Sequence, residues 1–152
     1  MANWCQNKLE LNYASTELLE YLSIEGFSFD KIVPVPDMQD KIGVDQCSAQ
    51  TKAWGTKWDL TEAEQEGVAD DLLQGLAYFA TAWGPPISVL HALSQKFPET
   101  NMTLYYVELG CLFAGITTFF DGMYDGECTS EDSDVWAIAT EHFGIEKEEN
   151  ED

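Results

Sequence analysis

Arginine is absent from this chain of 152 residues. Seven lysines stand against 28 Asp plus Glu, so the formal net charge at pH 7 is -21. Direct binding of nucleic acid or of an anionic membrane needs Lys and Arg in quantity, because both surfaces are densely negative. The composition argues against both and favours a partner that is itself basic, attracted by the field of the whole chain.

Targeting and zinc-binding patterns are missing too. The first residues lack a basic segment followed by an apolar run, and no later run approaches the ~20 apolar residues of a membrane span. The cysteines, at positions 5, 47, 111 and 128, show no CxxC or Cys/His ligand spacing. We therefore expect buried or idle thiols in a reducing cytoplasm, without zinc.

Motifs for catalysis are equally scarce. His91 and His142 are the only histidines, and neither has a nearby nucleophile motif such as GxSxG. Phosphate-cradling GxxxxGK[ST] and GxGxxG loops do not occur. The acidic segment 121–127 departs from an EF-hand because Met123 occupies a ligand position. The sequence predicts no enzyme activity, no cofactor and no dedicated metal site.

A sizeable core is nevertheless available. Apolar residues make up 45% of the chain and aromatic residues 12%, which argues against general disorder. The length favours one domain. We expect that domain to cover residues 1–146 and to be followed by an acidic, frayed tail at 147–152.

Hydrophobic periodicity predicts a mixed α and β chain. The expected order is a strand, a helix, two strands, a helix and a strand, followed by one extra strand and a C-terminal helix. This is the βαββαβ order of a ferredoxin-like α+β sandwich. Without the short second strand the order becomes βαβαβ, which allows a different winding. The expected strands are Trp4–Tyr13, Trp54–Trp58, Leu76–Trp83, Met102–Leu109 and Leu112–Phe120; the expected helices run from Ser15 or Thr16 to Ser23, from Ile87 to Phe97 and from Ser130 or Glu131 to Phe143; and segments 37–53, 60–71 and 121–134 are read as connections.

Five short motifs resemble the YubB ferredoxin-like family of small phage and plasmid proteins. They are Met1–Asn7, Phe29–Pro36, Trp54–Asp59, Thr81–Pro86 and Glu108–Gly115. The resemblance covers about residues 1–120. It implies a ferredoxin-like fold and a mobile-element origin, and it supplies no catalytic residues. Together with the missing targeting signals, this origin predicts a location in the cytoplasm of the bacterial host.

Acidic residues concentrate in two internal segments, 59–71 and 121–134. Carboxylates three or four positions apart on a helix lie ~5–6 Å apart, close to the spacing of neighbouring phosphates along one strand. Without arginine, few of them can be neutralised by bidentate pairs inside the protein. The predicted partner-binding residues are Asp59, Glu62, Glu64, Glu66, Asp70, Asp71, Asp121, Asp125, Glu127, Glu131, Asp132 and Asp134, together with Trp54 and Trp58.

These features predict an acidic mimic of nucleic acid. On this hypothesis the protein is a phage- or plasmid-encoded anti-defence inhibitor that occupies the DNA- or RNA-binding channel of a host CRISPR effector or restriction complex. The alternative is an interaction module without mimicry, in which a sheet edge or an exposed patch of Trp54 and Trp58 contacts the partner. In that case the acids only maintain solubility. The oligomeric state is left open.

Overall fold

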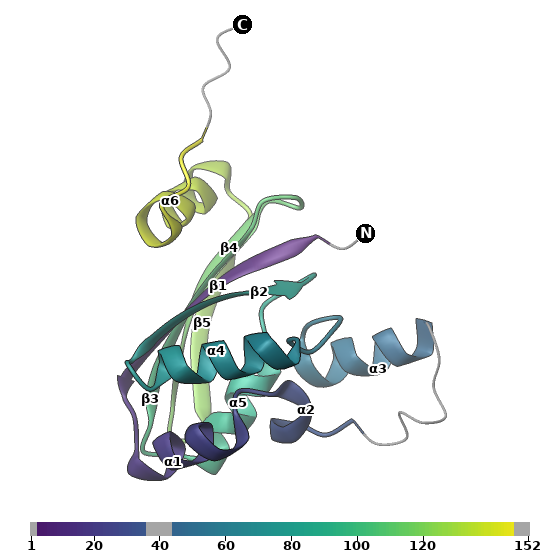
Figure 1. Cartoon of the computed structure of the whole chain (residues 1–152). Coiled ribbons are helices and arrows are strands. Elements are labelled where there is room, and N and C mark those ends of the chain that lie inside the picture. Colours follow the sequence, from purple (N-terminus) through teal and green to yellow (C-terminus); the bar gives the residue numbers. More distant parts are fainter. Residues whose placement is uncertain (1–2, 36–43, 148–152) are drawn as a thin grey trace, which may run out of the picture.

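Five antiparallel strands form one sheet in the order β2-β1-β3-β4-β5 (Figure 1). The computed structural model describes residues 3–35 and 44–147, except for the side chains of 44–48. Within these residues every helix is too short or too polar to cross a bilayer. The strands are β1 (Trp4–Tyr13), β2 (Leu76–Ala82), β3 (Asn101–Glu108), β4 (Phe113–Phe120) and β5 (Met123–Thr129).

Helices cover the two faces of the sheet unequally. The large core contains side chains of β1, β2, β3 and β4 together with those of the helices α1 to α5, whereas α6 covers a small separate core. Leu104 lies in the first core and Val107 in the second, because alternate residues of a strand face opposite sides. The helices are α1 (Thr16–Glu25), α2 (Phe29–Ile32), α3 (Val44–Trp54), α4 (Glu62–Leu72), α5 (Ile87–Lys96) and α6 (Asp132–Phe143).

The expected strand at Trp54–Trp58 is wrong. Helix α3 ends at Trp54, and the chain then bends through residue 58. Gly55 has a φ of +85°, and a Cβ there would lie 2.7 Å from the Pro85 carbonyl oxygen. A positive φ and a close backbone approach both favour glycine and break strand geometry. The segment makes a single ladder-like bond, from Lys57 N to Ala82 O at 3.0 Å.

Two connections expected from the sequence are helices. Segment 60–71 contains α4, which begins with a capping box: Thr61 Oγ1 accepts from Glu64 N at 3.2 Å, and Glu64 Oε1 accepts from Thr61 N at 3.0 Å. Its side chains are only partly exposed, since Val68 and Leu72 are buried. Helix α3 likewise replaces much of the long connection expected at 37–53, whose residues 37–43 lie outside the described part. The four-residue α2 was not expected.

Segment 121–134 contains strand β5, which the sequence reading also missed. Asp121 and Gly122 form a two-residue turn with φ values of 56° and 73°. Two positive φ values are what a type I′ hairpin requires. The final helix, α6, is confirmed. Lys147, expected in the frayed tail, forms an ion pair with Asp132 at 2.9 Å; the remainder of that tail lies outside the described residues.

Candidate functional site

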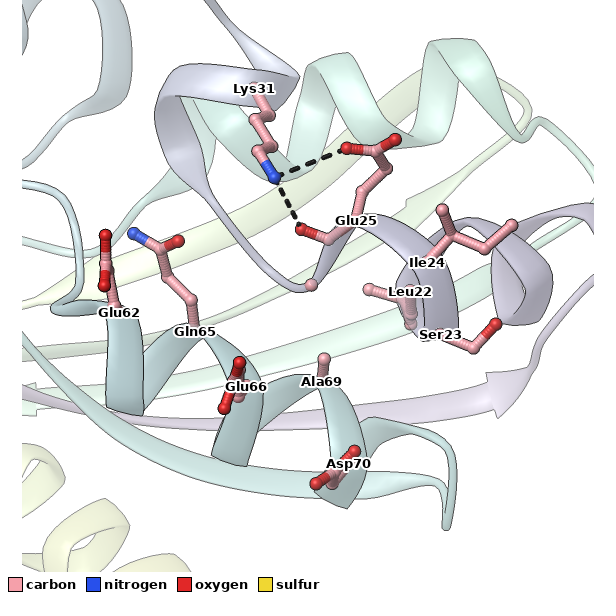
Figure 2. Close-up of a pocket in the computed structure, with 11 residues that line it drawn as sticks. Leu22, Ser23, Ile24, Glu25, Lys31, Glu62, Gln65, Glu66, Ala69 and Asp70 are labelled. Carbon is pink, nitrogen blue, oxygen red and sulfur yellow. Dashed lines mark hydrogen bonds and ion pairs between the residues drawn. The ribbon is translucent and has the colours of Figure 1, made fainter.

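An acidic groove lies between α1 and α4 (Figure 2). Its volume is about 530 Å³. Helix α4 packs mainly against β2 and also contacts α1, and the groove lies where these two helices meet. Its lining residues are Leu22, Ser23, Ile24, Glu25, Gly26, Lys31, Glu62, Gln65, Glu66, Ala69 and Asp70.

Three carboxylates of α4 follow one side of the groove. Glu62, Glu66 and Asp70 are exposed and stand four residues apart, so successive side chains share one helix face at ~6 Å spacing. We call this row the α4 ridge. Its spacing fits the regular negative charge that the sequence predicts for a partner-binding surface.

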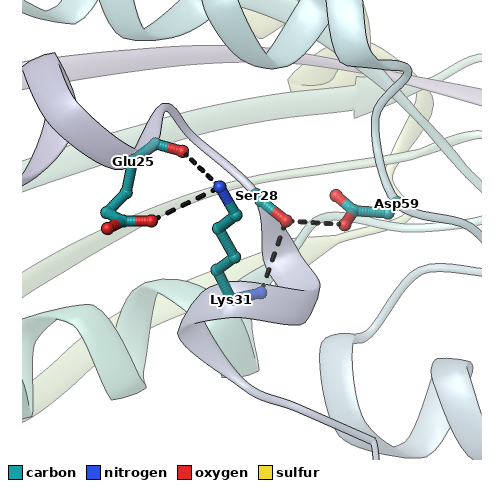
Figure 3. Close-up of polar contacts among 4 residues, drawn as sticks. All are labelled: Glu25, Ser28, Lys31 and Asp59. Carbon is teal, nitrogen blue, oxygen red and sulfur yellow. Dashed lines mark hydrogen bonds and ion pairs between the residues drawn. The ribbon is translucent and has the colours of Figure 1, made fainter.

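Lysine neutralises the opposite wall of the groove and leaves the ridge charged. Lys31 Nζ lies 3.3 Å from Glu25 Oε2 and donates to the Glu25 carbonyl oxygen at 3.2 Å (Figure 3). The pair is exposed, so it contributes little stability. Throughout residues 3–35 and 49–147, no α4 carboxylate forms an ion pair.

Asp59, which is predicted to contact a partner, accepts hydrogen bonds within the protein through its carboxylate. Its Oδ1 accepts hydrogen bonds from Phe29 N at 2.9 Å and Leu60 N at 2.7 Å. Its Oδ2 accepts from Ser28 Oγ at 3.1 Å (Figure 3). It also accepts from Asp30 N at 3.1 Å. Through these four hydrogen bonds, the Asp59 carboxylate links the start of α2 to the segment before α4. Glu64 is similarly engaged in the capping box, whereas exposed Asp71 lies beside the ridge.

The second acidic segment is divided by the fold. Asp125, Glu127 and Asp134 line a hollow of about 510 Å³ between β5 and α6. Asp121 lies at the other end of β5, in the hairpin turn. Glu131 is the N-cap residue of α6, and Asp132 is paired with Lys147. Sequence proximity therefore overstated how closely these six carboxylates gather.

The two acidic segments do not make one surface. Helix α4 packs beside β2 at one edge of the sheet, whereas β5 is the opposite edge strand. Five strands span about 19 Å between the two edges. In addition, the second hollow lies on the side covered by α6, and the ridge lies on the side of the large core.

The predicted patch of Trp54 and Trp58 is wrong, because Trp54 is only 2% exposed. Its Nε1 donates to the Val33 carbonyl oxygen at 2.8 Å, and its ring meets Phe29 edge-on. Trp58 is 40% exposed, with Trp4 nearby at a centroid distance of 6.0 Å. Sequence reasoning missed Trp4 and Trp83 as surface residues, since both adjoin or occupy strands that read as core.

Lys57 connects two of the exposed rings. Its Nζ lies 4.5 Å from the centroid of Trp58 and 4.7 Å from that of Trp83, which are cation–π distances. Trp83 has a φ of 77°, an uncommon and strained value for a bulky residue. Trp4, Trp58, Trp83 and Lys57 thus form a surface cluster, which we call the tryptophan cluster.

The two histidines lie on opposite sides of the sheet. His91, on α5, has Nε2 at 3.0 Å from the Gly122 carbonyl oxygen. His142, on α6, stacks on Tyr105 at a centroid distance of 3.9 Å. Burial, assisted by Lys8, lowers the pKa of His142. Among the described side chains, no group of three His, Cys, Asp or Glu residues is placed to hold a metal ion.

Burial governs the chemistry of Cys5, whereas Cys111 and Cys128 are exposed free thiols. Desolvation, with the Glu108 carboxylate adding to it, raises the pKa of Cys5 to about 12. The Glu108 carboxylate is itself buried and accepts from Gly110 N at 2.6 Å and Cys111 N at 2.8 Å. Cys47 lies outside the described side chains.

Cys5 is expected to resist thiol reagents in the folded protein. Iodoacetamide near pH 8 should modify Cys111 and Cys128 and leave Cys5 unmodified until denaturant is added, because the thiolate is the nucleophile. Peptide mapping by mass spectrometry resolves each site. Since folding raises this pKa from 9.0, the contribution of Cys5 to stability is complete below pH 9 and is lost as the pH rises towards about 12. Modification of folded Cys5 at the rate of Cys111 would contradict this expectation.

Comparison with known proteins gives one family match. A family model described as the ferredoxin-like domain in Api92-like protein matches residues 53–151. The matched part contains the α4 ridge and strands β2 to β5. No curated protein and no solved structure matches the chain.

Proposed function

The chain belongs to the family of the ferredoxin-like domain in Api92-like protein, a description that names no activity. We propose a function from the charges on the surface of this chain. The protein acts as an acidic inhibitor that takes the place of nucleic acid on a basic nucleic-acid-binding protein. The α4 ridge makes the central contact. The sequence resemblance implies that the inhibitor comes from a phage or plasmid. The acidic charge leads us to propose a host CRISPR effector or restriction complex as its target.

The observation that carries the proposal is the uncompensated row of carboxylates on α4. Glu62, Glu66 and Asp70 share one helix face, and Lys31 is already paired with Glu25. A protein that binds phosphates through Lys and Arg side chains can bind carboxylates of similar spacing and geometry with the same side chains. A rigid helix presents such anions in a fixed order, so binding loses little conformational entropy.

The division of the acidic segments limits the contact to one side. A partner seated on the α4 ridge would not reach Asp125, Glu127 and Asp134 unless it enclosed the sheet edge. We therefore propose that the ridge and neighbouring Asp71 contact the partner. The carboxylates that line the second hollow contribute to the solubility of the protein. Asp59 and Glu64 support this surface through their structural hydrogen bonds.

The test compares two matched triple variants. Glu62→Gln/Glu66→Gln/Asp70→Asn removes three charges from the ridge, and Asp125→Asn/Glu127→Gln/Asp134→Asn removes three from the second hollow. Immobilised wild-type protein should capture nucleic-acid-binding proteins from a bacterial lysate at 50 mM salt, and added duplex DNA should release them. The ridge variant should lose binding by about 10-fold or more and show a shallower salt dependence, since it forms fewer charge contacts.

The control variant should retain wild-type binding. Its net charge equals that of the ridge variant, so a general charge effect would weaken both equally. Equal weakening, or captured proteins that duplex DNA does not displace, would overturn the proposal. Circular dichroism of both variants establishes that the fold is kept.

A further inference from the structure

The outer edge of β2 has unpaired backbone groups. The backbone N–H and C=O groups of the odd-numbered residues of β2 are directed at β1, as the flanking bonds from Leu11 N to Gly75 O and from Trp83 N to Asn3 O indicate. The backbone groups of the even-numbered residues are directed away from the sheet. Lys57 N donates a hydrogen bond to the Ala82 carbonyl oxygen at 3.0 Å. Within the described residues, the backbone N–H and C=O groups of Leu76, Tyr78 and Ala80 have no hydrogen-bond partner.

This edge lacks the usual protection against strand pairing. Natural edge strands commonly carry charges, proline or a bulge. The sequence of β2, Leu-Ala-Tyr-Phe-Ala-Thr-Ala, contains no charged residue and no proline. Its register with β1 is regular, so β2 has no bulge. The opposite edge strand, β5, contains Asp125 and Glu127. Leu76 and Tyr78 are exposed on β2, so apolar surface accompanies the free backbone groups.

A small pocket adjoins the same edge. Its volume is about 220 Å³, and it opens beside Ala80 and Ala82, whose short side chains leave the space. The rings of Trp4 and Trp58 and the side chain of Glu64 line it. An aromatic wall with a nearby carboxylate suits the guanidinium of Arg or the ammonium of Lys. Lys57, held on Trp58 and Trp83, demonstrates that rings of this cluster already contact a cation.

The charges around the edge favour a basic occupant. Asp59 and Glu64 line the pocket, and the remaining carboxylates of α4 lie on the neighbouring helix. Of the nearby cations, Lys8 is paired with Glu10 at 3.4 Å and Lys57 lies over the tryptophan rings. A second copy of the chain would bring another net charge of -21 to the same edge.

We propose that β2 binds an extended, basic segment of a partner protein as an added strand of the sheet, with one Lys or Arg side chain in the pocket between Trp4, Trp58 and Glu64. The backbone ladder supplies affinity, and the pocket supplies selectivity for the basic side chain. This site is separate from the α4 ridge, so it can bind a flexible tail whether or not the ridge binds a nucleic-acid channel.

Model peptides provide the first test. The probe is the acetylated and amidated peptide Thr-Arg-Val-Lys-Val-Arg-Thr, with a counterpart in which Glu replaces every Arg and Lys. Two further versions carry N-methyl groups on alternate amides, each blocking one edge of the peptide. The basic peptide should bind, the acidic one should bind about 10-fold or more weakly, and at least one N-methylated version should lose binding to a similar extent.

Variants of β2 locate the binding. Ala80→Pro removes an outward N–H without breaking the bonds to β1, so it should abolish binding, whereas Ala80→Ser should not. Trp58→Ala removes a pocket wall and should weaken the basic peptide even if Ala80→Pro fails to fold. In NMR spectra, the peptide should shift the amide signals of Tyr78 and Ala80.

Three results with the peptides would overturn this inference, and a fourth concerns self-association. They are equal binding of all four peptides, binding lost in the α4 ridge variant but kept in Ala80→Pro, or amide shifts confined to α4. Self-association in sedimentation experiments that Ala80→Pro abolishes would assign the edge to a second copy and would likewise overturn the assignment to a basic segment. Because the ridge variant serves as the control here, failure of this inference leaves the proposed function standing.

Discussion

Trp54→Ala is expected to lower the free energy of unfolding by about 3–5 kcal/mol, the range for removing a large aromatic side chain from a core. The ring is buried against Phe29, and its Nε1 bonds to the Val33 carbonyl oxygen. The substitution leaves both a cavity and an unpaired acceptor. Urea unfolding followed by circular dichroism measures the change, with the slope m compared to check that unfolding remains two-state.

Trp58→Ala is the matched control for this prediction. Trp58 is 40% exposed, so its removal should cost about 1 kcal/mol or less, as for most surface substitutions. A similar loss of stability in both variants would contradict the division of the two residues into a core residue and a surface residue. That division matters because the sequence alone treated them as one patch.

Asp59→Ala is expected to lower the free energy of unfolding by about 2–4 kcal/mol, because hydrogen bonds to a charged group contribute about 1.5–3 kcal/mol each and are not additive. Four donors, from Ser28, Phe29, Asp30 and Leu60, lose their acceptor. Asp59→Asn retains one acceptor oxygen and should fall between the wild type and Asp59→Ala. Thermal and urea unfolding of the three proteins gives the order.

Glu66→Ala provides the comparison for Asp59→Ala. Glu66 is an exposed carboxylate of the same acidic segment and has no ion pair among the described residues. Its removal should change stability by about 0.5 kcal/mol or less. If Asp59→Ala were equally neutral, the carboxylate would not anchor α2 as the hydrogen bonds indicate.

Strong periodicity allowed much of the fold to be predicted. β1, β2, β3 and β4 combine apolar alternation with β-branched or aromatic residues, and each was expected within a few positions. α5 and α6 have clear stop signals in Pro98 and Gly144. The α+β class follows from these elements. The ferredoxin-like assignment is supported by the family match, although the second strand of the predicted βαββαβ order is wrong. The strand order depends on pairing between distant segments that local patterns do not specify.

Elements whose signals lie in their ends were missed. α4 is polar over most of its length, and its clearest mark is the capping box between Thr61 and Glu64. β5 has no apolar alternation, since nearly all of its residues are exposed, and its mark is the Asp121-Gly122 turn. Both patterns were legible in the sequence, but an excess of acidic residues in each segment suggested a loop.

The candidate site was predictable in composition but not in arrangement. Acid counts identified the segment that contains the α4 ridge. Only the three-dimensional structure separates Glu66, whose carboxylate is free to meet a partner, from Asp59, whose carboxylate is saturated by donors. The tryptophan cluster could not be foreseen, since Trp4 and Trp58 meet only after β1 pairs with β2.

The position of β1 has a consequence for the kinetics of folding. Asn7 pairs with Phe79 on one side and with Tyr106 on the other, so the ribosome releases β1 long before either partner has been made. Contacts this distant in sequence raise the contact order and slow the search for the native pairing. The helices α1 and α4 can form locally during that interval, whereas β1 cannot be paired on both sides until β3 has emerged from the exit tunnel.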